Sequence, residues 1–255
     1  MPTDAWFPLI VYYDDLEESA LYKASLLARI TELHIQSGAQ RTPENSAWTG
    51  DIHNVERVHC DPAFAWITQQ VGRHAWEYLR TLGHDLDLID LHIQRAWPVV
   101  SKKLQVVSRH AHHSGHLSAV YYVQVPTDGE GGELRFHNES RPNEFSGGLA
   151  GDMTKAYSQS NYTNFQSAIY KPIEGRLMLF PAKQVHSVDP HTSDQARISM
   201  SFDLVLTSRQ DRSPGEHEFL MPPPSQWQPV ARIESAAADS ESSDDLRPRS
   251  VLAAQ

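Results

Sequence analysis

The chain has 255 residues, a formal net charge of -10 with its histidines neutral, and a single cysteine. This length suits one catalytic domain, and the acidic balance argues against nucleic acid as a partner. One cysteine forms neither an internal disulfide nor a cysteine-based zinc site. No segment approaches the ~18 apolar residues of a membrane span, and no basic region precedes the first apolar run. We therefore expect a soluble, cytoplasmic protein without a membrane partner.

The first third of the chain predicts one strand and two helices. Residues 6–13, WFPLIVYY, are aromatic and β-branched, as is typical of a strand. Apolar residues recur at helical spacing over residues 16–37. The polar stretch 40–54 predicts a loop, and a second helix is expected over residues 61–83. That helix would begin at Asp61-Pro62, an N-cap residue followed by proline.

From about residue 86 the pattern changes to short apolar runs separated by turn residues. These runs predict strands at residues 86–100, 104–108, 117–125, 132–138, 167–173, 175–181 and 196–206. Helices followed by many strands indicate an α+β domain with a barrel or a two-sheet roll. We expect this domain to span residues 1–206, with its barrel core at about 86–206. Residues 207–255 would then form a C-terminal extension that is mostly disordered after about residue 222.

Two of the predicted strands carry polar side chains on one face. Four histidines precede the run 117–125, in which Ser118, Val120 and Tyr122 share a face by the two-residue period of a strand. In the run 196–206, Arg197, Ser199, Ser201 and Asp203 share one face, and apolar residues occupy the other. Such a polar face is unusual in a packed core. It is natural if the face lines a wet pocket inside a barrel and helices cover the outside.

The order of these residues favours iron chemistry. A non-haem Fe(II) site needs neutral imidazoles on one face of the metal and open positions opposite for a chelating co-substrate and oxygen. A dicarboxylate co-substrate also needs a fixed cation, and the planar fork of arginine matches a carboxylate. The chain provides histidines, a strand, Gly131-Gly132, a distal His186 and then Arg197-x-Ser199 in that order.

With these residues the sequence resembles the 2-oxoglutarate/Fe(II) oxygenase superfamily, and within it a bacterial and phage group with an H-x-H…LSGVYYV signature. The matching motifs are HAH at 110–112, LSAVYYV at 117–123, GGELRF at 131–136, GRLMLFP at 175–181, HSV at 186–188 and RISMS at 197–201. The resemblance covers roughly residues 6–206 and is strongest from 96 to 204. Two departures are His113 in place of the usual proline and Ala119 in place of the usual glycine.

The resemblance implies a double-stranded β-helix (jelly-roll) core, with the N-terminal helices packed on one sheet and iron at its mouth. It also implies oxidation of 2-oxoglutarate by O2 to succinate and CO2, coupled to hydroxylation of an unactivated C–H bond in a small amino-acid-like metabolite or a peptidyl side chain. By position, His110 and His186 are carried over as iron ligands and Arg197 as the partner of the distal carboxylate of 2-oxoglutarate. Tyr122 and Ser199 would assist that carboxylate.

The acid that the superfamily normally places two residues after its first histidine is replaced here by His112. Three readings are open: His112 is a third ligand, it stays off the metal, or it is itself the first ligand with Ser114 in the acid's place. We favour the first reading, so the predicted metal set is His110, His112 and His186. The literal H-x-D, His59-Cys60-Asp61, is a weaker candidate because Asp61 is better used as a helix cap.

Two other classes of function fit part of this pattern. A cupin-like module that binds a metal without redox turnover needs only the histidines and leaves Arg197-x-Ser199 unexplained. An oxygenase that halogenates or desaturates shares the pocket, although a halogenase usually has Gly or Ala at position 112. Substrate contacts are expected from loops around 46–53 and 138–157, with a flap formed by 145–152 and 160–165. His113 and His116 are expected to be surface or supporting groups.

Overall fold

The computed structural model describes residues 4, 6–38, 42–146, 149, 157–159, 161–209, 211 and 220–230. The chain divides into two compact units, Met1–Pro223 and Pro224–Gln255. In the second unit the described residues include one 3-10 turn, η7 (Pro224–Gln226). The disorder expected after residue 222 falls mostly on residues outside the described part. No helix of the described residues is long and apolar enough to cross a membrane.

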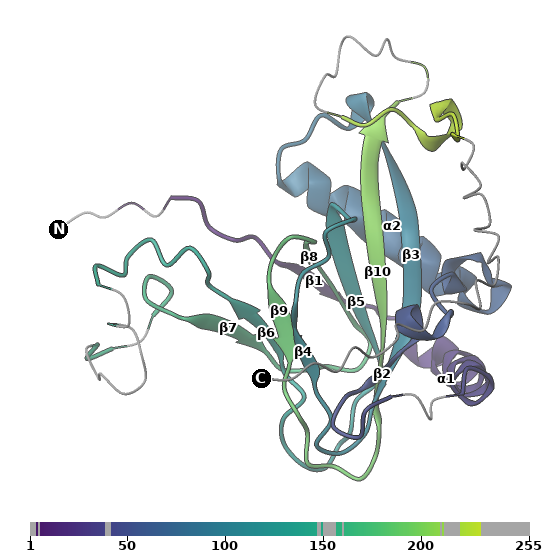
Figure 1. Ribbon diagram of the computed structural model, residues 1–255, viewed down its shortest axis with the longest axis vertical. Helices are drawn as coiled ribbons and strands as arrows, with labels where there is room; N and C mark the ends of the chain where they lie inside the picture. The colour runs from purple at the N-terminus through teal and green to yellow at the C-terminus, as the bar shows by residue number, and fades with distance from the viewer. Residues whose placement is uncertain are drawn as a thin grey trace, which may run out of the picture. The chain divides into compact units, whose positions relative to one another are not determined.

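The first unit is built on a six-stranded antiparallel sheet (Figure 1). In spatial order its strands are β1 (Tyr12–Asp15), β8 (Arg176–Pro181), β5 (Leu117–Gln124), β10 (Arg197–Ser208), β3 (Ile89–Ser101) and β2 (Trp48–Thr49). The two longest strands, β10 and β3, pair from Arg197↔Ser101 to Ser208↔Ile89. This long ladder holds the polar residues of β10 in the middle of the sheet.

A second, four-stranded antiparallel sheet faces the first. Its strands, in spatial order, are β4 (Val107–His110), β9 (His186–Val188), β6 (Leu134–His137) and β7 (Ser167–Tyr170). Side chains from both sheets share one apolar core, in which Leu134 and Phe136 of β6 pack with Val120, Met178 and Phe180 of the larger sheet. The two facing sheets form the predicted jelly-roll core.

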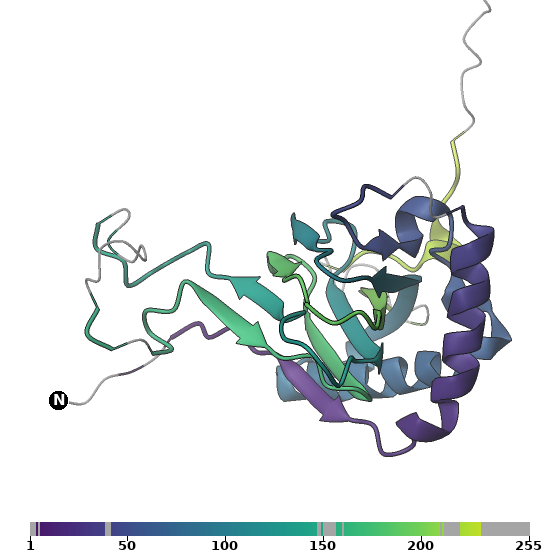
Figure 2. The same cartoon turned by 90° about the horizontal axis from the view of Figure 1, so that it is seen from below.

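Two helices, α1 (Ser19–Gln36) and α2 (Ala65–Thr81), cover the outer face of the larger sheet, which Figure 2 shows from below. Ile30 of α1 and Ile67 of α2 are fully buried in the same core as Tyr121 and Met200 of the sheet. The short 3-10 turns are η2 (Gly50–His53), η3 (Val58–Cys60), η4 (Pro62–Phe64) and η5 (Leu86–Leu88). The predicted α+β class, with helices packed on one sheet, is confirmed.

The N-terminal strand is shorter than the sequence predicts. Ladder pairing begins only at Tyr12, opposite Leu179 of β8, whereas Trp6 and Phe7 are exposed. Phe7 has a left-handed φ of 62°, which is incompatible with a strand, and Pro8 has no N–H to donate to a ladder. The prediction of a strand over residues 6–11 was therefore wrong because apolar composition does not supply a pairing partner.

Candidate metal and co-substrate site

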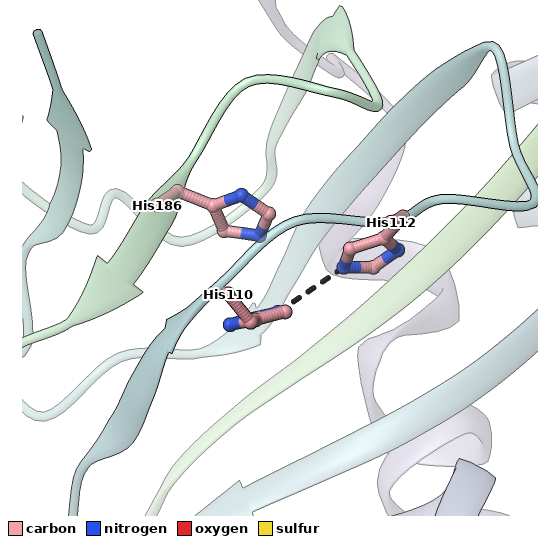
Figure 3. A group of neighbouring side chains, drawn as sticks. All are labelled: His110, His112 and His186. Carbon is pink, nitrogen blue, oxygen red and sulfur yellow. Dashed lines mark hydrogen bonds between the residues drawn. The ribbon is translucent and has the colours of Figure 1, made fainter. Parts of the chain in front are cut away.

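Three histidines converge at the edge of the smaller sheet (Figure 3). His110 ends β4, His186 begins β9, and these two residues lie opposite each other in the ladder. His112 follows in the connection to β5, with its Nε2 3.1 Å from Nε2 of His110. One ligand atom from each of the three lies within 4.8 Å of the other two, and this is the only such metal-binding group among the described residues.

The orientation of each ring is set by a hydrogen bond from its Nδ1. His110 donates to the carbonyl of Ser108 at 2.7 Å, and His186 donates to the carbonyl of Gln184 at 2.8 Å. His112 donates to Oδ1 of Asp203 at 2.5 Å. A proton on Nδ1 leaves the Nε2 lone pair free, and acceptors placed in this way are typical of metal-ligating histidines. The three free nitrogens can therefore hold one metal ion.

Burial keeps the imidazoles of His110 and His186 neutral. Burial, with a contribution from neighbouring His110, lowers the pKa of His186 to about 3. Burial also lowers the pKa of His110. Since a metal binds only the neutral form of imidazole, both side chains are in the binding form near pH 7.

Asp203 supports His112 from inside the barrel, and the sequence assigned it no role beyond its place on the polar face. It is fully buried on β10, where Oδ1 also accepts a hydrogen bond from Ser118 Oγ at 3.2 Å and Oδ2 forms an ion pair with Arg95 of β3. Burial acts to raise the pKa of Asp203, but the hydrogen bonds and charges of His112 and Arg95 outweigh it and lower the pKa below its usual value. Asp203 is therefore a carboxylate that faces His112.

A cavity of about 350 Å³ opens in front of the histidines. Arg197, Ser199 and Ser201 of β10 line it, as the alternation of β10 predicts, together with the three histidines. Arg197 is only 1% exposed, and its Nε and Nη1 have no hydrogen-bond partner among the described residues. Buried guanidinium N–H groups without acceptors are unfavourable, so this end of the cavity favours an anion.

Tyr122 lies behind Arg197 instead of lining the cavity in the described structure. The guanidinium carbon of Arg197 is 5.1 Å from the centroid of the Tyr122 ring, which is a cation–π distance. Tyr122 is fully buried, its hydroxyl has no partner in the described part of the chain, and burial raises its pKa. The side chain of Tyr122 is therefore neutral where it packs against the guanidinium of Arg197.

These side chains fit an Fe(II) ion and a dicarboxylate. Three imidazole nitrogens on one side of a cavity suit an iron ion with open positions opposite. The unpaired donors of Arg197 suit the far carboxylate of a chelating diacid. The three imidazole nitrogens and the cationic end of the cavity therefore suit the two ends of one metal-chelating diacid.

The other predicted candidates lie outside the metal-binding group of the described residues. His113 and His116 are exposed, and Nδ1 of His116 accepts the backbone N–H of Leu206 at 2.9 Å. Asp61 caps η4 by accepting the N–H of Ala63 at 3.0 Å, and Arg29 donates to its other oxygen at 2.8 Å. The prediction that the literal H-x-D provides a helix cap is confirmed.

The loop regions expected to contact substrate line different pockets of the described structure. Thr49 and Asp51, from the predicted loop at 46–53, line the cavity. Thr163 and Phe165 instead line a separate, smaller pocket together with Asn138 and Tyr157. Most of the other predicted flap segment, 145–152, lies outside the described residues.

Comparison with known proteins agrees with this geometry. Residues 95–203 match a family model described as "Putative 2OG-Fe(II) oxygenase". The carbocyclase SnoK from nogalamycin biosynthesis, a non-heme α-ketoglutarate-dependent enzyme, is similar in structure with a TM-score of 0.52 at 15% identity, over 84% of this chain and 87% of that chain. A prolyl-4-hydroxylase from Pseudomonas putida has a TM-score of 0.49 at 14% identity, over 76% and 92% of the two chains. No curated protein matches the sequence.

SnoK, the similar structure with a TM-score above 0.5, supports the jelly-roll fold alone because its sequence identity is low. The family model is a match of sequence, and it covers both strands that carry the candidate site, β5 and most of β10, together with all three histidines. The cofactors of this family are Fe(II), 2-oxoglutarate and O2, and the histidine group provides a place for the metal. Residues 95–203 of this chain therefore resemble a 2-oxoglutarate/Fe(II) oxygenase domain in both sequence and fold.

Proposed function

We propose that the protein is an Fe(II)- and 2-oxoglutarate-dependent hydroxylase. Its substrate would be a small amino-acid-like metabolite or a peptidyl side chain that presents an unactivated C–H bond, and the co-products would be succinate and CO2. His110, His112 and His186 would hold the iron. Arg197 would bind the distal carboxylate of 2-oxoglutarate with help from Ser199 and, through the guanidinium, from Tyr122.

The observation that carries this proposal is the buried, unpaired Arg197 in the same cavity as three free histidine nitrogens. A module that only stored a metal would have no need for a desolvated cation at the other end of the cavity. A chelating diacid needs both ends, because one carboxylate and the keto oxygen bind the metal and the other carboxylate requires a partner.

Different residues of the chain would have different functions in such a reaction. Bound iron would supply the activation of O2. The three histidines orient the metal, and the carboxylate of Asp203 keeps the Nδ1 proton of His112 in place. Arg197 and Ser199 fix the orientation of the co-substrate. The apolar walls at Val99, Val107 and Val188 limit water near the reacting atoms.

Release of succinate tests this proposal. The protein incubated in air with Fe(II) and 2-oxoglutarate should form succinate slowly even without a substrate, and the Arg197→Ala variant should form it at a rate at least ~100-fold lower at the same 2-oxoglutarate concentration, because a desolvated charge pair is lost. Arg80→Ala is the matched control, since this arginine on α2 is 61% exposed. Equal 2-oxoglutarate affinity in wild type and Arg197→Ala would show that the co-substrate pocket is misassigned.

Halogenation and desaturation remain outcomes to be separated by product analysis. A halogenase needs space beside the metal for a halide, whereas the His112 ring stands in that position with its Nε2 3.1 Å from His110. We therefore expect no chlorinated product when chloride is present, and mass spectrometry of the products would detect one.

A further inference from the structure

One charged group of the cavity is left without a role by the proposed function. Asp51, in the turn η2, lines the same cavity as the histidines. Its Oδ1 atom is buried and has no hydrogen-bond partner in the described structure. Among the described residues that line the cavity, Asp51 is the only acid.

The turn that carries Asp51 is held firmly against β3. A Cβ atom at Gly50 would lie 2.9 Å from the carbonyl oxygen of Val55 and 3.0 Å from Cδ of Pro98, so only glycine allows this approach. The N–H of Val55 donates to the carbonyl of Gly50 at 2.8 Å, and Nδ1 of His53 donates to the carbonyl of Thr49 at 2.7 Å. The position of Asp51 is therefore set by packing.

Neither arginine that lines the cavity forms an ion pair with Asp51 among the described residues. Arg95 pairs with Asp203, and Nε and Nη1 of Arg197 have no partner. Asp51 and His110 line the same cavity, so the carboxylate lies on the side of the cavity that faces the metal position. A partly desolvated carboxylate without a partner is unfavourable, and a positively charged ligand group would remove this cost.

The wall beside Asp51 is apolar. Trp97 and Val99 of β3 line the cavity and are 4% and 5% exposed, and Val107 of β4 lines it as well. Hydrocarbon surface of this kind packs well against an aliphatic chain. A ligand that is cationic at one end and aliphatic beyond it would satisfy both Asp51 and these side chains.

Asp51 is separate from the metal-binding group. The three histidines offer ligand atoms within 4.8 Å of one another, and the carboxylate of Asp51 does not belong to that set. The carboxylate of Asp51 thus lies away from the metal position. It can bind one group of a substrate while the neighbouring carbon atoms of that substrate face the metal.

We propose that Asp51 binds a positively charged group of the substrate, an alkylammonium or a guanidinium, and so places the adjacent aliphatic C–H bonds in front of the three histidines. This inference rests on the proposed hydroxylase function and narrows its substrates to cationic aliphatic molecules or basic side chains. Asp51 is then a residue that determines specificity, whereas Arg197 serves the co-substrate.

Calorimetric titration of the anaerobic, Fe(II)-loaded protein tests the proposal, with 2-oxoglutarate added first. The probes are n-butylammonium and methylguanidinium, with n-butanol as the neutral counterpart of the first. We expect at least one cation to bind the wild type about 10-fold or more tightly than n-butanol, and Asp51→Asn to lose about 10-fold or more of that affinity because one partner of a desolvated charge pair is gone. The matched control is Asp194→Asn, which removes a negative charge from an 89% exposed side chain.

The outcomes are distinct. Failure of 2-oxoglutarate to bind would overturn the proposed function, while the titration of the cations would still report on Asp51. Binding of neither cation, equal binding of n-butanol, or unchanged cation binding by Asp51→Asn would overturn the assignment of Asp51. Loss of Fe(II) affinity in Asp51→Asn would also overturn it, because Asp51 would then act on the metal.

Discussion

His112 stands where the superfamily carries an acid, and in this structure an acid lies directly behind it. The Nδ1 of His112 donates to Asp203, whose other oxygen pairs with Arg95. If His112 is a ligand, the negative charge that usually touches the metal has moved one side chain outward. Such an arrangement raises the basicity of the imidazole and fixes its tautomer.

At this scale we predict that Asp203→Asn weakens Fe(II) binding about 10–100-fold, since removal of the acceptor behind a ligating histidine typically costs this much. Anaerobic calorimetry measures the affinity, and circular dichroism checks that the variant is folded. Because Asp203 acts through His112, the same substitution in a His112→Ala background should have little further effect. An equally large loss in that background would assign Asp203 a purely structural role.

The alternation along β10 was the most informative feature of the sequence at the level of elements. Its odd-numbered residues from Arg197 to Asp203 face the barrel interior, and Ile198, Met200 and Phe202 pack under the helices, as predicted. Period-two alternation is local and can be read from sequence. The pairing that sets His110 opposite His186, and the register that sets Asp203 opposite Arg95, depend on contacts between distant segments. The strands β2 and β9 were missed because two or three residues carry no pattern.

The two faces of β10 should respond differently to truncation. Phe202 is fully buried, so Phe202→Ala should lower the free energy of unfolding by about 3–5 kcal/mol. Ser199 has a small side chain that lines the cavity, so Ser199→Ala should change stability little and weaken 2-oxoglutarate binding. Chemical denaturation and a 2-oxoglutarate titration measure the two effects. A similar loss of stability in both variants would contradict this division of the strand.

The turn at Gly131-Gly132 makes room for the cationic end of the cavity. Gly132 has a φ of +80°, and a Cβ atom there would lie 3.2 Å from Cδ of Arg197. We predict that Gly132→Ala weakens 2-oxoglutarate binding. The left-handed backbone at this position should in addition lower the stability of the variant by about 1–2 kcal/mol. Gly83→Ala is the matched control, since Gly83 has a φ of +82° and no atom within 4 Å of its added Cβ. Equal 2-oxoglutarate affinity in the two variants would show that Gly132 does not position Arg197.

At the scale of the whole molecule, two facing sheets enclose one cavity and the helix layer closes the outside of the larger sheet. The α+β class and the jelly-roll core could be predicted because helical and strand periodicities separate cleanly along the chain. The polar end of the cavity was visible as an ordered set of His, Arg and Ser. The proposed role of Asp51 and the ion pair of Arg95 were not visible in the sequence, because Asp51 lies in a loop without a repeating pattern and the partner of Arg95 is more than 100 residues away.

The most direct test of the central claim is an anaerobic absorption titration of 2-oxoglutarate into the Fe(II)-loaded protein. Three histidines and Arg197 in one cavity predict a weak metal-to-ligand charge-transfer band in the visible range, at one equivalent of iron, that Arg197→Ala forms only at much higher 2-oxoglutarate concentrations. A protein that binds one Fe(II) ion but develops no band at any 2-oxoglutarate concentration would contradict the assignment of this cavity to metal and co-substrate together.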